Sequence, residues 1–184
     1  MNKYLIDLAY AFQKVKTEFY SWTALDGRAR NYLQEGENNF SSEITRHFRN
    51  QMEKNRNTRY YAGRNLMCHF DVRKARVHIQ PDIVLHESPN NTHRQEFLAE
   101  VKIDENAALN ADLTKLLIAI SPVLDFKYAV MIVANKPLTA TITEINLFKN
   151  NNQVSVGDQK KLYLYHSIIV AGIPEYYFSN FFTL

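Results

Sequence analysis

The chain contains little cysteine, glycine and proline, and it has no long hydrophobic run. Its 184 residues include one cysteine, Cys68, with five glycines and five prolines. A single cysteine cannot form an internal disulfide or supply a zinc-ribbon ligand set, and so few glycines and prolines exclude a collagen-like chain or a flexible linker. No apolar run reaches the about 18 residues that a membrane helix needs, and Lys3 and Asp7 interrupt the N-terminal apolar residues, unlike a signal peptide. We therefore expect a cytoplasmic protein without a membrane segment.

The remaining composition is that of an ordinary globular protein. Hydrophobic residues make up 46% of the chain and charged residues 22%, which argues against intrinsic disorder. A chain of this length can bury a core of its own without metal or disulfide support. The sequence therefore predicts a single domain over residues 1–184.

The formal net charge of +3 hides an uneven distribution. Residues 41–80 hold nine Lys or Arg against three Asp or Glu, whereas residues 81–184 hold eight against eleven. A basic block next to an acidic one is typical of a protein in which one face meets a polyanion and another holds a cation. The alternative is a solvated surface on which arginines pair locally with acids.

The spacing of apolar residues predicts the order of helices and strands. Apolar residues recur every three or four positions in 5–19, in a helix starting near Ser41 or Ser42, in 109–120 and in 138–148. They alternate in 66–70, 77–85 and 97–103, and form short apolar runs in 128–134 and 161–170, which predicts strands. This order predicts an α/β (α+β) fold with a mixed central sheet flanked by helices. The aromatic tail at 176–184 is expected to pack on the domain or on a partner.

The polar residues 88–94 predict a turn that joins the second and third strands in a hairpin, and two short motifs lie in this hairpin. Pro81-Asp82 occurs on the second strand, and Glu100-Val101-Lys102 occurs on the third. The acid-x-Lys pattern occurs three times in the chain, but only this copy follows a Pro-Asp and lies in an alternating strand. Glu100 and Lys102 project from one face, roughly 7 Å apart. An acid and a lysine within an apolar strand are costly unless they are paired or used.

Pro81-Asp82, Glu100-Val101-Lys102 and the helix that follows resemble the PD-(D/E)xK nuclease superfamily over about residues 40–135. The resemblance implies a restriction endonuclease-like core of helix, three antiparallel strands, helix and strand. It also implies an acid on the preceding helix. Glu43 is the best positional match, and Glu35 and Glu37 are weaker ones.

The resemblance further implies a metal-dependent endonuclease that hydrolyses phosphodiester bonds in DNA. Asp82, Glu100 and the Val101 carbonyl would hold Mg²⁺ or Mn²⁺, ions that prefer oxygen ligands, and Glu43 would hold a metal-bound water or a second ion. Lys102 would orient the attacking water or stabilise charge on the phosphate. The basic residues expected to bind nucleic acid are Arg46, Arg49, Arg73, Lys74, Arg76 and Lys115.

A second hypothesis is a catalytically inactive nuclease-fold module that binds nucleic acid or a protein. A fold does not fix a function, and a chain of this size leaves little room for base readout beyond the catalytic core. The aromatic tail would then serve as the surface for a protein partner or for a second copy in a homodimer.

Overall fold

The computed structural model describes residues 2–20, 32–70, 79–87 and 95–184, and the side chains from residue 36 onward in the second of these ranges. The strands are β1 Leu66–Phe70, β2 Ile83–Glu87, β3 Gln95–Lys102, β4 Phe126–Ala134, β5 Leu162–Val170 and β6 Ile173–Asn180. The helices are α1 Lys3–Gln13, η1 Thr17–Phe19, α2 Tyr32–Asn55, α3 Asn110–Ile120, α4 Leu138–Asn151, α5 Val156–Gln159 and η2 Phe181–Thr183.

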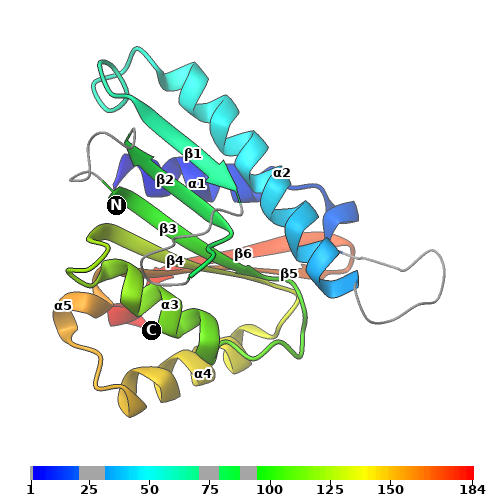
Figure 1. Ribbon diagram of the computed structural model, residues 1–184. Helices are drawn as coiled ribbons and strands as arrows, with labels where there is room; N and C mark the ends of the chain where they lie inside the picture. Colours follow the sequence, from blue (N-terminus) through cyan, green and yellow to red (C-terminus); the bar gives the residue numbers. More distant parts are fainter. Residues whose placement is uncertain (1, 21–31, 71–78, 88–94) are drawn as a thin grey trace.

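The strands form one mixed sheet in the order β1-β2-β3-β4-β5-β6 (Figure 1). β1, β2 and β3 are antiparallel, β3, β4 and β5 are parallel, and β6 returns antiparallel to β5. The parallel pairs need crossover connections, which α3 and α4 supply. The predicted mixed sheet flanked by helices is therefore confirmed.

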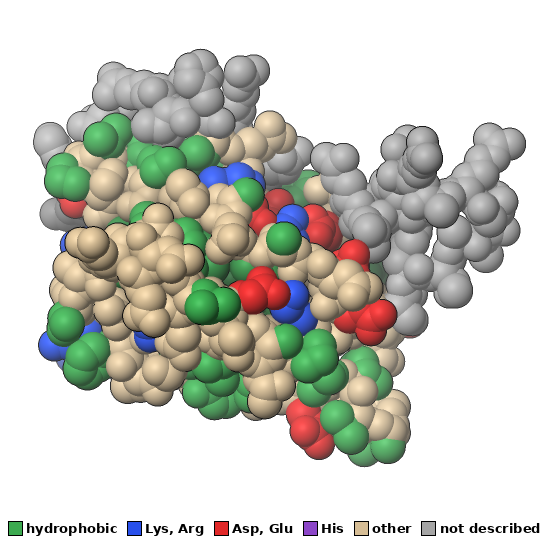
Figure 2. Space-filling view, turned by 90° about the horizontal axis from the view of Figure 1, so that it is seen from below, with side chains coloured by type: hydrophobic (Ala, Val, Ile, Leu, Met, Phe, Trp, Pro, Cys, Tyr) green, Lys and Arg blue, Asp and Glu red, His purple; other side chains and the backbone are tan. Residues whose placement is uncertain are grey.

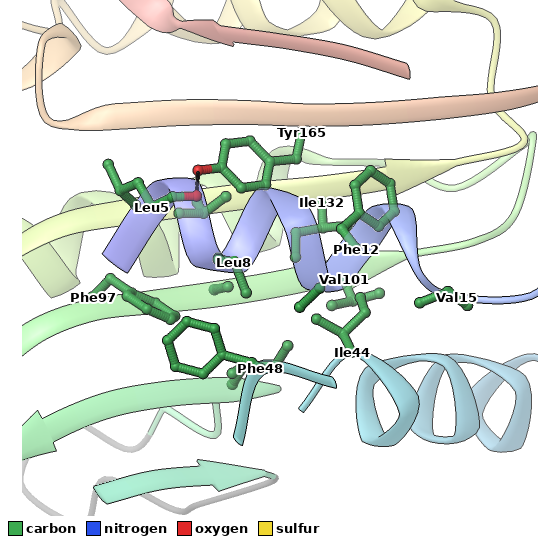
Figure 3. Close-up of a cluster of buried hydrophobic side chains, with 14 of the residues drawn as sticks. Leu5, Leu8, Phe12, Val15, Ile44, Phe48, Phe97, Val101, Ile132 and Tyr165 are labelled. Atoms are coloured by element: carbon green, nitrogen blue, oxygen red, sulfur yellow. Dashed lines mark hydrogen bonds between the residues drawn. The ribbon is translucent and has the colours of Figure 1, made fainter. Parts of the chain in front are cut away.

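The sheet separates two hydrophobic clusters, because successive side chains of a strand point to opposite faces. α1 and α2 cover one face, where Leu8, Phe12 and Phe48 meet Phe97 and Tyr165, all fully buried (Figure 3). The Tyr165 hydroxyl donates a 2.6 Å hydrogen bond to the Leu5 carbonyl and so ties α1 to the sheet. α3 and α4 cover the other face, where the buried cluster includes residues of β2, β3, β4 and β5.

The first two helices differ in extent from the prediction. The first ends at Gln13 rather than continuing to Phe19, which lies in η1. The second begins at Tyr32, well before the expected start at Ser41 or Ser42, and Ser41 is fully buried within it. The polar residues before Phe40 lack an apolar stripe, but Gln and Glu are good helix formers and allow the helix to extend.

The aromatic tail packs on the domain, as one of the two predicted arrangements, and contributes a sixth strand that the sequence did not reveal. In β6, Tyr176 and Phe178 contact the Phe12 ring edge-on, with centroids 5.5 and 6.2 Å apart. Phe181, which follows β6, is fully buried. Consecutive aromatic residues obscure the period-two alternation by which a strand is recognised.

Helices of the described ranges are all too short or too polar to cross a membrane.

Candidate functional site

Asp82 and the β3 motif residues lie side by side at one end of the sheet, but Asp82 directly precedes β2, which begins at Ile83, whereas the predicted strand 77–85 includes Asp82. β2 and β3 pair antiparallel with Ile83 opposite Ala99, so Asp82, just before β2, and Glu100 of β3 both flank this pair. The Val101 backbone N–H donates a 2.7 Å hydrogen bond to Asp82 Oδ2. This bond fixes the Asp82 carboxylate beside the strand that carries Glu100 and Lys102.

The two flanking helices add three more charged side chains. Lys115 of α3 lies 3.0 Å from Glu100 Oε2 and 2.7 Å from Asp112 Oδ1. Lys102 lies 3.0 Å from Glu37 Oε2 of α2 and 3.4 Å from Asp112 Oδ2. The result is a chain of alternating charge in the order Glu37, Lys102, Asp112, Lys115 and Glu100. Together with Asp82, these residues are called the carboxylate–lysine cluster below.

Burial disfavours ionisation of the Asp82 and Glu100 carboxyl groups. It raises the pKa of Asp82 to about 6, although the Val101 N–H and the Lys102 charge favour the carboxylate. It raises the pKa of Glu100 to about 8, and the nearby negative charge of Asp82 adds to this effect. Glu100 is only 2% exposed. Both groups would therefore gain from an additional positive charge.

The lysines are held in their charged form. Burial alone would lower their pKa values, but the charges of Asp112 and Glu37 outweigh it and raise the pKa of Lys102. The contacts of Lys115 with Asp112 and Glu100 likewise raise the pKa of Lys115. Burial also raises the pKa of Glu37. Both lysines are thus positively charged at neutral pH.

The cluster has the charge and the free oxygen atoms that suit a divalent cation. Its four carboxyl groups exceed its two lysines, so a divalent ion would balance the fully ionised set. Glu100 Oε1 is buried and has no hydrogen-bond partner among the described residues, although buried polar atoms normally have one. Figure 2 shows acidic and basic side chains next to one another over the middle of one face of the molecule, with a few more set apart at its margins.

The carboxylates are nevertheless not arranged around a common point. In the described ranges, no three Asp, Glu, His or Cys side chains are grouped so that they could hold one metal ion. The lysine contacts give the reason, because the ammonium groups of Lys102 and Lys115 lie between the carboxylates. In this conformation the two lysines neutralise part of the negative charge of the four carboxyl groups.

Glu43 does not join the cluster. Its carboxylate bonds Arg46, with Arg46 Nε 2.8 Å from Oε2, and lies 3.2 Å from His47. On a helix Glu43 points about 100° away from its neighbour Ile44, which faces the sheet. Glu37 is seven residues before Ile44 and so lies on nearly the same stripe. The acid that α2 brings to the motif is therefore Glu37, the weaker positional match, and the side chain of Glu35 lies outside the described residues.

The basic residues expected to bind nucleic acid have different surroundings. Arg46 is exposed and paired with Glu43, and Arg49 donates two hydrogen bonds, of 3.1 and 2.7 Å, to the Cys68 carbonyl of β1. Arg49 thus ties α2 to the edge of the sheet. Lys115 belongs to the carboxylate–lysine cluster. Arg73, Lys74 and Arg76 lie outside the described residues.

Asp112 is the cluster member that the sequence analysis missed. It precedes Lys115 by three residues on α3, and this spacing places two side chains on one face of a helix. That spacing was a usable signal, because Lys115 was already a candidate. Glu37 is the weaker positional match by sequence because the polar run around it has no apolar stripe that predicts a helix, although α2 includes it.

Comparisons with protein-family models, curated proteins and solved structures find no match for this chain.

Proposed function

We propose that this protein is a metal-dependent nuclease of the PD-(D/E)xK type that hydrolyses phosphodiester bonds in DNA. The observation that carries the proposal is the meeting of Asp82, Glu100 and Lys102 with Lys115 and an acid of α2 in one cluster. The element order α2, β1–β3, α3 and β4 supports a restriction endonuclease-like core, because it is the order that the motif resemblance implies.

Each residue has a role that follows from its chemistry. Asp82, Glu100 and the Val101 carbonyl would hold Mg²⁺ or Mn²⁺, with the unpartnered Glu100 Oε1 as one donor. Such an ion supplies a nucleophilic water at neutral pH and neutralises charge on the phosphate. The Lys102 ammonium would orient this water or stabilise negative charge on the scissile phosphate. Glu37 and Asp112 would hold Lys102 in place, since both contact its ammonium group.

Plasmid cleavage with Mg²⁺ or Mn²⁺ tests the proposal. Asp82→Asn, Glu100→Gln and Lys102→Met are each expected to lower the cleavage rate by about 100-fold or more, since electrostatic groups at a reacting centre contribute on this scale. Lys160→Met is the matched control for Lys102, because Lys160 belongs to another acid-x-Lys tripeptide, Asp158-Gln159-Lys160. Glu43→Gln is the control for an acid of α2 outside the cluster.

Thermal unfolding of each variant separates loss of activity from loss of fold. Glu100→Gln is expected to leave the fold at least as stable, because burial already disfavours the ionised carboxylate. Cleavage at the wild-type rate by Asp82→Asn and Glu100→Gln would rule out the proposed mechanism.

A second candidate function is a catalytically inactive nuclease-fold module that binds nucleic acid or a protein. The arrangement that favours it is the pair of lysines held among the carboxylates, with no three metal-ligating side chains converging in the described residues. Such a module would bind DNA in a salt-dependent way without cleaving it in either metal. Filter binding at two salt concentrations, beside the plasmid assay, distinguishes the two functions.

A further inference from the structure

We propose that Lys115, held by Asp112, acts as an internal cation that competes with a divalent metal ion for Glu100. The inference rests on the proposed metal site, and it concerns how that site is filled. It makes Lys115 a positioning residue that sets the metal concentration at which the site becomes occupied.

The contacts of Lys115 place its positive charge directly on Glu100. Its ammonium group lies 3.0 Å from Glu100 Oε2 and 2.7 Å from Asp112 Oδ1, so it bridges a residue of β3 and a residue of its own helix. A divalent ion needs carboxylate oxygens at about 2.1 Å. A lysine ammonium and a metal ion cannot both neutralise one buried carboxylate at such short range without strong repulsion. Lys115 therefore opposes binding of the ion to Glu100, and the bound ion favours withdrawal of Lys115.

The burial of Glu100 leaves its carboxylate with few partners. Its side chain is 2% exposed and its second oxygen, Oε1, has no hydrogen-bond partner in the described part of the chain. The carboxylate thus receives its single described hydrogen bond from Lys115, and it has one oxygen left for another ligand. An ionised carboxylate is costly in a buried position without a cation, so the charged form of Glu100 is favoured by either of the two cations.

Asp112 is a second acid partner for the Lys115 ammonium group. Because Asp112 bonds Lys115 within α3, three residues apart, the ammonium group keeps one acid partner after it leaves Glu100. The Lys115 side chain is 31% exposed, so its head can also turn toward solvent. The exchange therefore requires a change of side-chain conformation and leaves the helix in place.

Lys102 provides the matched comparison within the same cluster. It carries the same charge, but the ammonium contacts that it makes within the described part of the chain are with Glu37 and Asp112, 3.0 and 3.4 Å away, rather than with Glu100. Removing Lys102 changes the electrostatic field at the site, whereas removing Lys115 also removes the direct competitor. Lys127, which pairs with Glu96, is a control outside the cluster.

Titration calorimetry with Mn²⁺ alone, without DNA, tests the inference. Lys115→Gln, which keeps an amide donor but no charge, is expected to bind Mn²⁺ about tenfold or more tightly than the wild type, since one nearby charge shifts an ionisation equilibrium by about one to three units. Lys115→Met also removes the charge and should give the same gain, so that a folding defect in one of the two variants does not decide the test. Lys102→Met should show a clearly smaller gain, and Lys127→Met none.

The outcomes separate this inference from the proposed function. Unchanged or weaker Mn²⁺ binding by both Lys115 variants would overturn the competition. Equal gains for Lys102→Met and Lys115→Gln would overturn it as well, because a general field effect would then suffice. Tighter binding without DNA cleavage by the wild type would support the competition and reject the nuclease. Absence of Mn²⁺ binding in the wild type and in every variant would reject both.

Discussion

His166 of β5 is a buried histidine whose ionisation opposes folding. It is 2% exposed, and its Nε2 lies 2.7 Å from the Lys136 carbonyl, which requires the Nε2–H tautomer as donor. Burial lowers the pKa of His166 below its ordinary value of 6.5, and the bond to the Lys136 carbonyl only partly opposes this effect. The folded protein therefore keeps His166 neutral at a pH where the unfolded chain takes up a proton.

We expect this group to destabilise the protein as the pH falls. Its contribution to the free energy of unfolding is fully present above the unfolded pKa and is lost as the pH falls from 6.5 toward the lower folded pKa. His166→Gln keeps an N–H donor without the titration, so its free energy of unfolding should fall less steeply between about pH 7 and pH 5.

Urea denaturation at several pH values measures this difference. His47→Gln is the control, because burial also lowers the pKa of His47, but its side chain is 20% exposed and should contribute less. Equal slopes for the wild type and His166→Gln would show that the ring is not kept neutral by the fold.

The residues of the candidate site differ in how far the sequence could reveal them. Strand alternation predicts that Glu100 and Lys102 share one layer, because it fixes the direction of each side chain, and the motif resemblance adds Asp82. Glu37 and Asp112 contribute through helices, where a contact depends on the angle at which the helix crosses the sheet. Such an angle is a property of packing, and no local pattern encodes it.

The turn of the β5–β6 hairpin consists of two residues in the left-handed backbone conformation. Val170 pairs with Ile173, so Ala171 and Gly172 form the turn, with φ angles of 51° and 80°. Two positive φ angles are those of a type I′ turn, which favours Asn-Gly. Glycine adopts this conformation freely, but alanine does so with strain because its Cβ approaches the following carbonyl.

Relief of this strain should stabilise the protein. Ala171→Asn is expected to raise the free energy of unfolding by about 0.5–1 kcal/mol, since asparagine tolerates the left-handed region. Differential scanning calorimetry should show a Tm higher by about 1–4 °C. The same change in α4, Ala140→Asn, should destabilise by about 0.7 kcal/mol, because alanine is the better helix former. A lower Tm for Ala171→Asn would contradict the assignment of strain to this turn.

The elements themselves were predictable where their periodicity was strong. α3, β4, α4 and β5 lie within a few residues of their predicted bounds, because apolar spacing and Pro122 mark them clearly. β6 escaped detection because its turn is Ala-Gly rather than Asn-Gly and its aromatic residues are adjacent. The predicted turn at 88–94 lies outside the described residues, although the antiparallel pairing of β2 with β3 is confirmed.

At the scale of the whole molecule, the sheet lies between two hydrophobic cores and contributes side chains to both. Neighbouring residues on β3 serve different sides, with Phe97 in the cluster under α1 and α2, and Leu98 in the cluster under α3 and α4. A strand that loses its packing on one face therefore also loses its support on the other. The two cores should unfold together, as most single domains of this size do.

Truncating one side chain in each core tests this coupling. Leu8→Ala removes a fully buried side chain of α1, and Leu164→Ala removes one of β5 from the opposite core. Each is expected to cost about 2–5 kcal/mol, whereas Leu147→Ala, at a side chain 56% exposed on α4, should cost little. Urea denaturation followed by far-UV circular dichroism and by near-UV circular dichroism should give coincident transitions in both core variants. Separate transitions would show that one core survives without the other, and that the sheet does not couple the packing of α3 and α4 on one face to the packing of α1 and α2 on the other.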